Sequence, residues 1–348
     1  MTRKSFLLLL PISLLFLGLS LPGCFQSKQA GIWRSDDGGE TWAFKVKIDE
    51  KQSIAALNIL KTVFDPTDPQ TIYFGSEGKG MYVSHNNGDT WARTKIAIGD
   101  VWDIAIDSDD PKIMYVSVFS GGAGRLYATR DGGENWEMVF ADAIVGQPLY
   151  NVVINWYNHN NIIINTGWGG ILKSEDQGKT WTKLAELTAK TGRLQMDEQD
   201  SRMMWYVTST EGIFKSEDGG VSWTEIALEG LKPFKGGSWI YQLERDKRNN
   251  TFYLATSYGL LLSQDEGRTW TPMKTLTPSA SLPIVAVAVN PQNQEELFFV
   301  AGNTVFKSVN EGESWQVRKM YAAEAIRIVR YHPVNPNIIY LGLRAVKK

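Results

Sequence analysis

The chain has 348 residues, 43% of them hydrophobic and 21% charged, so it can bury a core and is not a disordered polypeptide. Its 36 basic residues are balanced by 38 acidic ones, and the net charge of −2 argues against general nucleic-acid binding. One cysteine and three widely spaced histidines exclude a disulfide framework and disfavour a metal centre, so we predict no metal and no cofactor.

Residues 1–23 have the pattern of an export signal, with Arg3 and Lys4 ahead of an apolar run. The run Leu21-Pro22-Gly23-Cys24 resembles the lipobox of bacterial lipoproteins, in which the cysteine is lipidated. This resemblance implies lipidation at Cys24, a short tether over 24–30, and an exported protein held on the periplasmic or lumenal side of a membrane. A plain signal peptide or an uncleaved anchor is the alternative.

An eight-residue motif then recurs seven times, from SDDGGETW at 35–42 to SVNEGESW at 308–315. A period in the forties built from short strands is typical of a β-propeller blade. The third position is always Asp or Asn: Asp37, Asn86, Asp131, Asp176, Asp218, Asp265 and Asn310. The eighth is always tryptophan: Trp42, Trp91, Trp136, Trp181, Trp223, Trp270 and Trp315.

Each column of the motif has a structural explanation. The Asp or Asn side chain can accept backbone N–H groups in a tight turn. The glycine at the fifth position is expected where the turn requires a positive φ. The tryptophan can fill the space between neighbouring sheets. We therefore interpret these residues as structural rather than catalytic.

Between the motifs lie pairs of apolar strands joined by a polar turn, such as VFDPTDPQTIYFGS at 63–76. The first motif has no such pair before it, and the last pair, at about 325–343, has no motif after it. We therefore expect 31–44 and about 325–343 to complete one blade together. The prediction is an all-β protein: a single seven-bladed propeller of four-stranded blades over 31–348, closed by its N- and C-terminal strands.

Alignment of the innermost strands identifies candidate binding residues in the central channel. With the turn residue of the fifth blade taken as Arg245, the column four residues before each turn contains Lys61, Asp103, Asn151, Arg193 and Tyr241. Alternation along a strand places this column opposite the apolar one, towards the channel, with Arg327 and Arg330 as companions. A binding site and a plain water-filled channel both remain open.

Three longer connections, 137–150, 224–241 and 271–284, should lie on one face of the ring. Phe234, Trp239, Tyr150 and Tyr241 could form a contact surface there or serve as packing residues.

The motif S/T-x-D/N-x-G-x-T/N/S-W resembles the Asp-box, or BNR repeat. A single seven-bladed Asp-box propeller behind a lipoprotein-type signal is similar to the photosystem II stability/assembly factor family. That resemblance implies a monomeric, non-catalytic scaffold that binds a protein partner, such as a membrane-protein complex under assembly.

Glycoside hydrolases and glycan-binding proteins with Asp-boxes are the alternative. Sialidases resemble the chain in their repeats but have six blades and an Arg-Ile-Pro motif, which is absent here. Xyloglucanase-type enzymes use two propellers with one carboxylate from each. A hydrolase needs two carboxylates across a cleft, and the channel column supplies only Asp103. Sortilin-type receptors also share the box but carry a larger propeller and disulfides.

Overall fold

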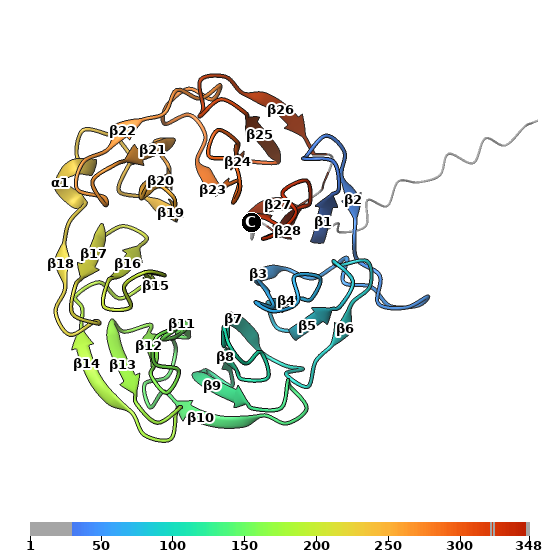
Figure 1. Cartoon of the computed structure of the whole chain (residues 1–348), viewed down its shortest axis with the longest axis vertical. Coiled ribbons are helices and arrows are strands. Elements are labelled where there is room, and N and C mark those ends of the chain that lie inside the picture. The colour runs from blue at the N-terminus through green and yellow to red at the C-terminus, as the bar shows by residue number, and fades with distance from the viewer. Residues whose placement is uncertain (1–29, 321, 323, 346–348) are drawn as a thin grey trace, which may run out of the picture.

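The structure, a computed structural model, describes residues 30–320, 322 and 324–345. It contains seven four-stranded antiparallel sheets arranged in a ring (Figure 1). One short helix, α1 (Leu228–Leu231), accompanies 28 strands. The predicted all-β, seven-bladed propeller is therefore confirmed. The predictions of a leader, of lipidation at Cys24 and of most of the tether lie outside the described residues.

The first six blades follow the chain in order, each with its innermost strand first. The first three blades are β3 (Ile59–Phe64), β4 (Ile72–Ser76), β5 (Gly80–Ser84) and β6 (Ala92–Arg93); β7 (Asp100–Ile106), β8 (Met114–Ser120), β9 (Ala123–Thr129) and β10 (Glu137–Ala141); and β11 (Leu149–Ile154), β12 (Ile162–Thr166), β13 (Gly170–Ser174) and β14 (Thr182–Glu186). The next three are β15 (Gly192–Met196), β16 (Met204–Thr208), β17 (Ile213–Ser216) and β18 (Thr224–Glu225); β19 (Ile240–Asp246), β20 (Thr251–Thr256), β21 (Leu260–Ser263) and β22 (Thr271–Pro272); and β23 (Ile284–Val289), β24 (Leu297–Ala301), β25 (Thr304–Ser308) and β26 (Gln316–Lys319).

The seventh blade is built from both ends of the described chain. Its strand order is β2 (Ala43–Phe44), β1 (Gly31–Ser35), β28 (Ile339–Arg344) and β27 (Ala325–Tyr331). In the β1–β28 register, Gly31 pairs with Leu343 and Ser35 with Ile339. The ring is thus closed within one sheet, as expected, because strands from both ends of the described chain complete the seventh blade.

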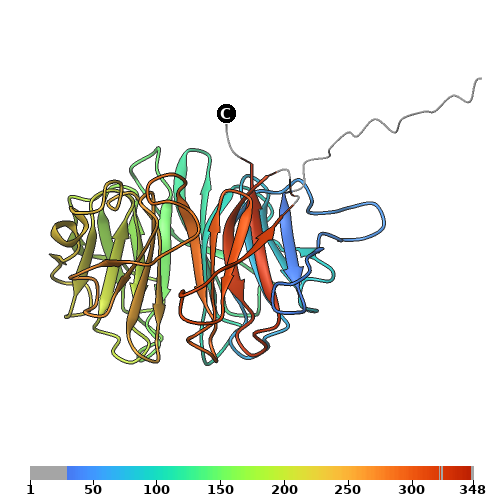
Figure 2. The same ribbon diagram turned by 90° about the horizontal axis from the view of Figure 1, so that it is seen from above.

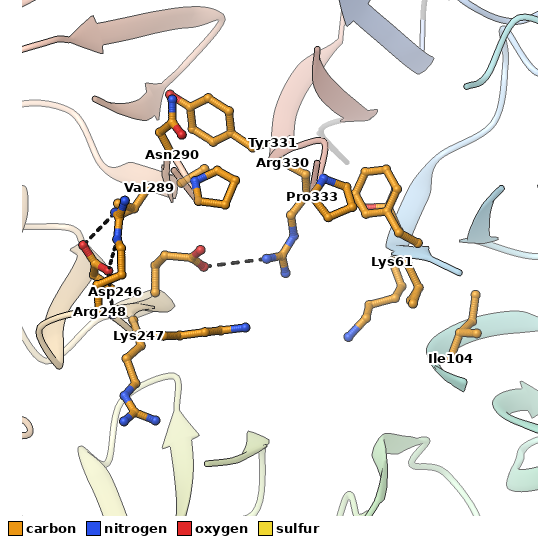
Figure 3. Close-up of a pocket in the computed structure, with 17 residues that line it drawn as sticks. Lys61, Ile104, Asp246, Lys247, Arg248, Val289, Asn290, Arg330, Tyr331 and Pro333 are labelled. Carbon is orange, nitrogen blue, oxygen red and sulfur yellow. Dashed lines mark hydrogen bonds and ion pairs between the residues drawn. The ribbon is translucent and has the colours of Figure 1, made fainter. Parts of the chain in front are cut away.

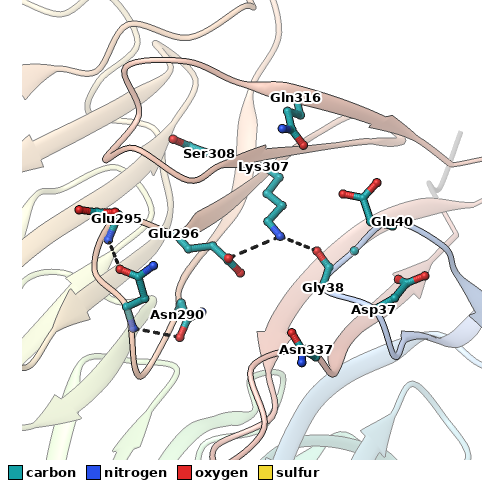
Figure 4. A network of polar contacts seen from close by, with 12 residues as sticks. Asp37, Gly38, Glu40, Asn290, Glu295, Glu296, Lys307, Ser308, Gln316 and Asn337 are labelled. Carbon is teal, nitrogen blue, oxygen red and sulfur yellow. Dashed lines mark hydrogen bonds and ion pairs between the residues drawn. The ribbon is translucent and has the colours of Figure 1, made fainter.

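A buried lysine links the sixth blade to the N-terminal part of the seventh (Figure 4). Lys307 Nζ on β25 donates to the carbonyl of Gly38 at 2.8 Å and lies 3.5 Å from Glu296 Oε2. Glu296 in turn accepts from the Tyr331 hydroxyl at 2.9 Å. This network joins residues from β25, the repeat turn after β1, and β27.

The repeat turns all have the same backbone conformation. In the first, Asp37 Oδ1 accepts the Thr41 N–H at 2.8 Å, and Ser35 Oγ accepts the Gly39 N–H at 2.8 Å. The fifth-position glycines have φ between 85° and 94°. The fourth position is left-handed too, with φ of 58° at Asn87, 59° at Gln177 and 60° at Glu266, a feature that the motif did not reveal.

The core consists of apolar side chains packed between neighbouring blades. One cluster joins the seventh and first blades: Ile32, Ile54, Ile59, Ile72, Phe74, Tyr82, Trp91 and Tyr340. Within it the Trp91 indole packs edge-on against Phe74 and donates to the Lys45 carbonyl at 2.9 Å. The repeat tryptophan thereby binds its blade to the preceding one by both packing and a hydrogen bond.

The two faces of the ring differ in their connections (Figure 2). The innermost strands begin at the face that carries the connections between blades, here called the loop face, which is uppermost in Figure 2. The repeat turns lie at the opposite face, the turn face. Within the described ranges no helix is long and apolar enough to cross a membrane.

Candidate functional site

A cavity of about 950 Å³ occupies the central channel, and its lining extends from Thr191 and Ser209 near the loop face to Glu198 and Lys247 near the turn face. A second cavity of about 460 Å³ lies towards the turn face, and both are lined by Lys61, Glu244 and Arg330. The two cavities therefore adjoin each other in the channel. Figure 3 shows Lys61 and Arg330 pointing into the space between the innermost strands.

Six of the seven innermost strands carry a β-bulge near their start. A bulge inserts one extra residue and re-aims its side chain. All six inserted residues line the larger cavity: Leu60, Trp102, Tyr150, Tyr241, Val285 and Arg327. The bulges thus create a second set of channel residues, of which Trp102 on β7, Tyr150 on β11 and Tyr241 on β19 are aromatic.

These three aromatic side chains are partly fixed by contacts within the described residues. The Trp102 and Tyr150 rings meet edge-on at 5.3 Å, and the Tyr241 hydroxyl lies 3.2 Å from Ser257 Oγ. Tyr241 is 40% exposed, so it is available to a ligand at the channel mouth. The Trp102 indole N–H is buried and has no hydrogen-bond partner among the described residues. Alternation of strand residues did not identify Trp102, because a bulge breaks that alternation.

The predicted column is present in the first four blades but shifted by one residue in the fifth. Lys61, Asp103, Asn151 and Arg193 pair with Gly75, Ser117, Asn165 and Val207, the same position of each second strand. In the fifth blade that position, Ala255, pairs with Gln242. The assignment of Tyr241 to this column was therefore wrong, although Tyr241 still lines the channel.

The shift arises because the turn residue of the fifth blade is Asp246 and not Arg245. Asp246 Oδ1 accepts the Arg248 N–H at 3.0 Å, as Asp65 Oδ1 accepts the Thr67 N–H at 2.8 Å in the first blade. Arg245 instead pairs with Asp197 of the fourth blade.

Two members of the column, Asp103 and Asn151, connect neighbouring innermost strands. Asp103 Oδ2 accepts from Asn151 Nδ2 at 2.8 Å and from the Val152 N–H at 3.1 Å, while its Oδ1 lies 2.6 Å from Lys61 Nζ. Asn151 Oδ1 accepts the Leu194 N–H at 3.0 Å. Both side chains are almost fully buried. They act as cross-links between the first four blades. Most of their hydrogen-bonding atoms are therefore already used and are not available to a ligand.

Arg193 and Arg327 are the channel cations without an ion-pair partner among the described residues. The side chains of Arg193 and Arg327 are exposed to the channel. Burial lowers the pKa of Arg193, and repulsion from Arg330 and Arg344 adds to that effect, although Asp103 opposes it. Burial likewise lowers the pKa of Lys61 against the attraction of Asp103, and Arg193 lowers it further.

The carboxylates that line the channel are already engaged. Glu198 pairs with Lys247, Glu244 lies 3.6 Å from Arg330 Nη1, and Asp246 lies 2.9 Å from Arg248 Nε. Burial raises the pKa of Glu244, while the positive charge of Arg330 opposes this rise. No group of three or more His, Cys, Asp or Glu suited to a metal occurs in the described part of the chain.

The three longer connections lie on the loop face. Trp239 is 60% exposed there, whereas Phe234 packs edge-on against Tyr258 at 5.1 Å. Tyr150 and Tyr241 line the channel. Of the four residues considered for a contact surface, Phe234 is therefore a packing residue, Tyr150 and Tyr241 line the cavity, and Trp239 is exposed on the loop face.

Comparison with known proteins gives a partial family match and a strong match of fold. The family described as Sortilin, neurotensin receptor 3, matches residues 30–167. An oligoxyloglucan-reducing-end-specific xyloglucanase of Emericella nidulans is 27% identical over 136 residues, which cover 36% of this chain and 15% of that enzyme. The chain thus spans a small part of this curated relative.

Solved structures of GH74 enzymes and of YCF48 are among those that share the fold. The GH74 xyloglucanase of Xanthomonas campestris has a TM-score of 0.67 at 15% identity, over 83% of this chain and 51% of that one. YCF48 bound to a D1 peptide has a TM-score of 0.64 at 13% identity, over 84% of this chain and 94% of that one. YCF48 from Cyanidioschyzon merolae aligns similarly, with a TM-score of 0.63 at 13% identity, over 82% and 95% of the two chains. At these identities the likeness establishes the propeller fold alone.

Proposed function

We propose that this chain is a non-catalytic binding protein that receives a polypeptide segment of its partner at the loop-face mouth of the channel. The observation that carries the proposal is the composition of that mouth. Trp102, Tyr150 and Tyr241 lie beside the unpaired Arg193 and Arg327. Aromatic residues and arginine are the side chains most enriched at the energetic centres of protein interfaces.

The comparison with known structures also supports this proposal. The likeness to YCF48, which has been captured with a D1 peptide, supports a peptide ligand because one propeller accounts for nearly all of that chain. By the same analogy, we propose that the partner belongs to a membrane-protein complex under assembly.

The lipidation predicted at Cys24 fits this role. An N-terminal lipid would hold the propeller close to a membrane-embedded partner, and a single site on such a tethered protein gains from the high local concentration. This anchoring remains a prediction from the sequence.

Glycoside hydrolysis is the second candidate, favoured by the match to the xyloglucanase of Emericella nidulans. Hydrolysis with inversion or retention requires two carboxyl groups on opposite sides of the scissile bond. The lining carboxylates Glu198, Glu244 and Asp246 are each held by a lysine or arginine, which favours binding over hydrolysis. Release of sugar from xyloglucan oligosaccharides by the purified protein would establish the hydrolase instead.

The binding proposal can be tested by cross-linking the tagged protein to membranes of its source organism and identifying the products by mass spectrometry. Trp239→Asp places a charge on the loop face, where Trp239 is 60% exposed. This variant should no longer capture the membrane-protein partner that the parent protein captures in stoichiometric amount. Tyr157→Asp is the matched control, because Tyr157 is 78% exposed on the turn face and should leave capture unchanged. Equal capture by both variants, or loss only in Tyr157→Asp, would contradict the assignment of the loop face.

A further inference from the structure

More basic than acidic side chains line the larger cavity. Seven lysines and arginines line it (Lys61, Arg193, Arg245, Lys247, Arg327, Arg330 and Arg344), against two glutamates, Glu198 and Glu244. Field lines in such a low-dielectric channel concentrate along its axis. The cavity is therefore a region of positive potential in a protein whose net charge is −2.

Five of these cations are balanced by an acidic residue in the wall or just behind it. Lys61 pairs with Asp103, Arg245 with Asp197, Lys247 with Glu198, Arg330 with Glu244 and Arg344 with Glu77. Arg193 and Arg327 remain, and neither forms an ion pair within the ranges that the structure describes. Two positive charges thus face the channel without a fixed counter-charge.

The charges of Lys61 and Arg193 are unfavourable for each other. Burial disfavours the charged form of both Lys61 and Arg193, and each is further disfavoured by the other cations around the axis. An anion placed among the cations that line the cavity would relieve their mutual repulsion. Asp103 supplies only part of this compensation, because its Oδ1 is bound to Lys61 and its Oδ2 to the next blade.

We propose that the central channel binds an oxyanion, either a carboxylate or a phosphate group, between the guanidinium of Arg193 and the ammonium of Lys61. A guanidinium presents a planar fork of donors that matches such a group, and an ammonium has three donors, of which Asp103 uses one. Trp102 and Tyr150 form the neighbouring wall and would limit access of water to the ion pair.

The oxyanion has two sources: a free anion, or an acidic side chain of the polypeptide that the loop face receives. Binding of a free anion is independent of the proposed function, whereas binding of an acidic side chain rests on it. Inorganic phosphate and succinate serve as probes for a free anion, and a labelled hexaglutamate peptide serves for the side chain.

Isothermal titration of the full chain at low ionic strength should show saturable binding of at least one probe. Arg193→Gln should weaken that binding at least tenfold. Arg202→Gln, on an exposed arginine of the turn face, should leave it unchanged. Without any probe, Arg193→Gln should melt no lower than the parent protein, because it removes a repelled charge.

The outcomes separate the two sources. Tighter binding of hexaglutamate than of succinate or phosphate supports the acidic side chain, and the reverse order supports a free anion. Absence of binding by all three probes, or equal binding to the parent and Arg193→Gln, overturns the anion site. Neither of those results affects capture of a partner by the loop face, which Trp239→Asp tests separately.

Discussion

At the scale of single residues, Asp176 shows how one carboxylate holds a repeat turn. Its Oδ1 accepts the Thr180 N–H at 2.8 Å and its Oδ2 accepts the Thr180 hydroxyl at 2.6 Å. These bonds to Thr180 lower the pKa of Asp176 to about 2 from an ordinary value of 3.8. Asn86 makes the same backbone bond in its turn and donates from Nδ2 to Thr90 Oγ1 at 2.9 Å.

We therefore expect Asp176→Asn to preserve stability at neutral pH and to reduce its loss in acid. The lowered pKa means that the stabilisation by Asp176 is complete above pH 3.8 and disappears as the pH falls towards 2. Asparagine keeps the backbone bond without a group that titrates there. Thermal melts at pH 7, 4 and 3 would measure this, with Glu313→Gln as an exposed control, and identical acid profiles for Asp176→Asn and the parent would refute it.

At the scale of elements, the innermost strands show where prediction from sequence succeeds and where it stops. The seven motifs and their spacing determined blade number, strand order and the shared seventh blade, because each column has a local physical cause. The bulges at Trp102, Tyr150 and Tyr241 could not be predicted, since an inserted residue leaves no mark in an apolar strand. The shift in the fifth blade has a simpler origin: Arg245 and Asp246 are adjacent, and the carboxylate, which can accept turn N–H groups, should have been preferred.

The cross-links between innermost strands lead to a prediction about Asp103. Asp103→Ala would leave Lys61 without its partner in the channel and the Val152 N–H without an acceptor. Breaking a buried pair in this way typically costs about 3–5 kcal/mol, so urea unfolding should show a large loss of stability. Glu134→Ala is the control, because the Lys95–Glu134 pair is exposed and such pairs contribute about 0–1 kcal/mol. Equal losses in the two variants would show that the Asp103 contacts do not hold the blades together.

At the scale of the whole molecule, ring closure depends on contacts between distant parts of the sequence. The Lys307–Gly38 bond, which Figure 4 shows, spans 269 residues. The equivalent contact between Lys215 and Glu266 spans 51. Contacts across a long separation are the ones that must offset the most chain entropy. The seventh blade is therefore expected to be the weakest point of the ring.

Lys307→Met tests that expectation. It removes the hydrogen bond to the Gly38 carbonyl and leaves the Glu296 carboxylate without the positive charge of Lys307 beside it. We expect a loss of about 1–3 kcal/mol in the free energy of unfolding. Amide hydrogen exchange should accelerate in β1 and β28 and stay unchanged in β12 and β16 across the ring. Lys215→Met should affect exchange only around its own two blades. Uniform acceleration throughout the ring in Lys307→Met would argue that the propeller opens as one unit.

The shared blade also fixes an order of events in time. Strands β1 and β2 are synthesised first, but the strands that complete their sheet, β27 and β28, are the last described ones to leave the ribosome. Six blades can assemble while the chain is still being synthesised, and the seventh cannot. Until then β1 is an unpaired edge, of the kind that chaperones cover and that other chains can invade. The pairing of β28 with β1 is therefore the step that completes the fold, and the chain is exposed to chaperones and proteases until it has occurred.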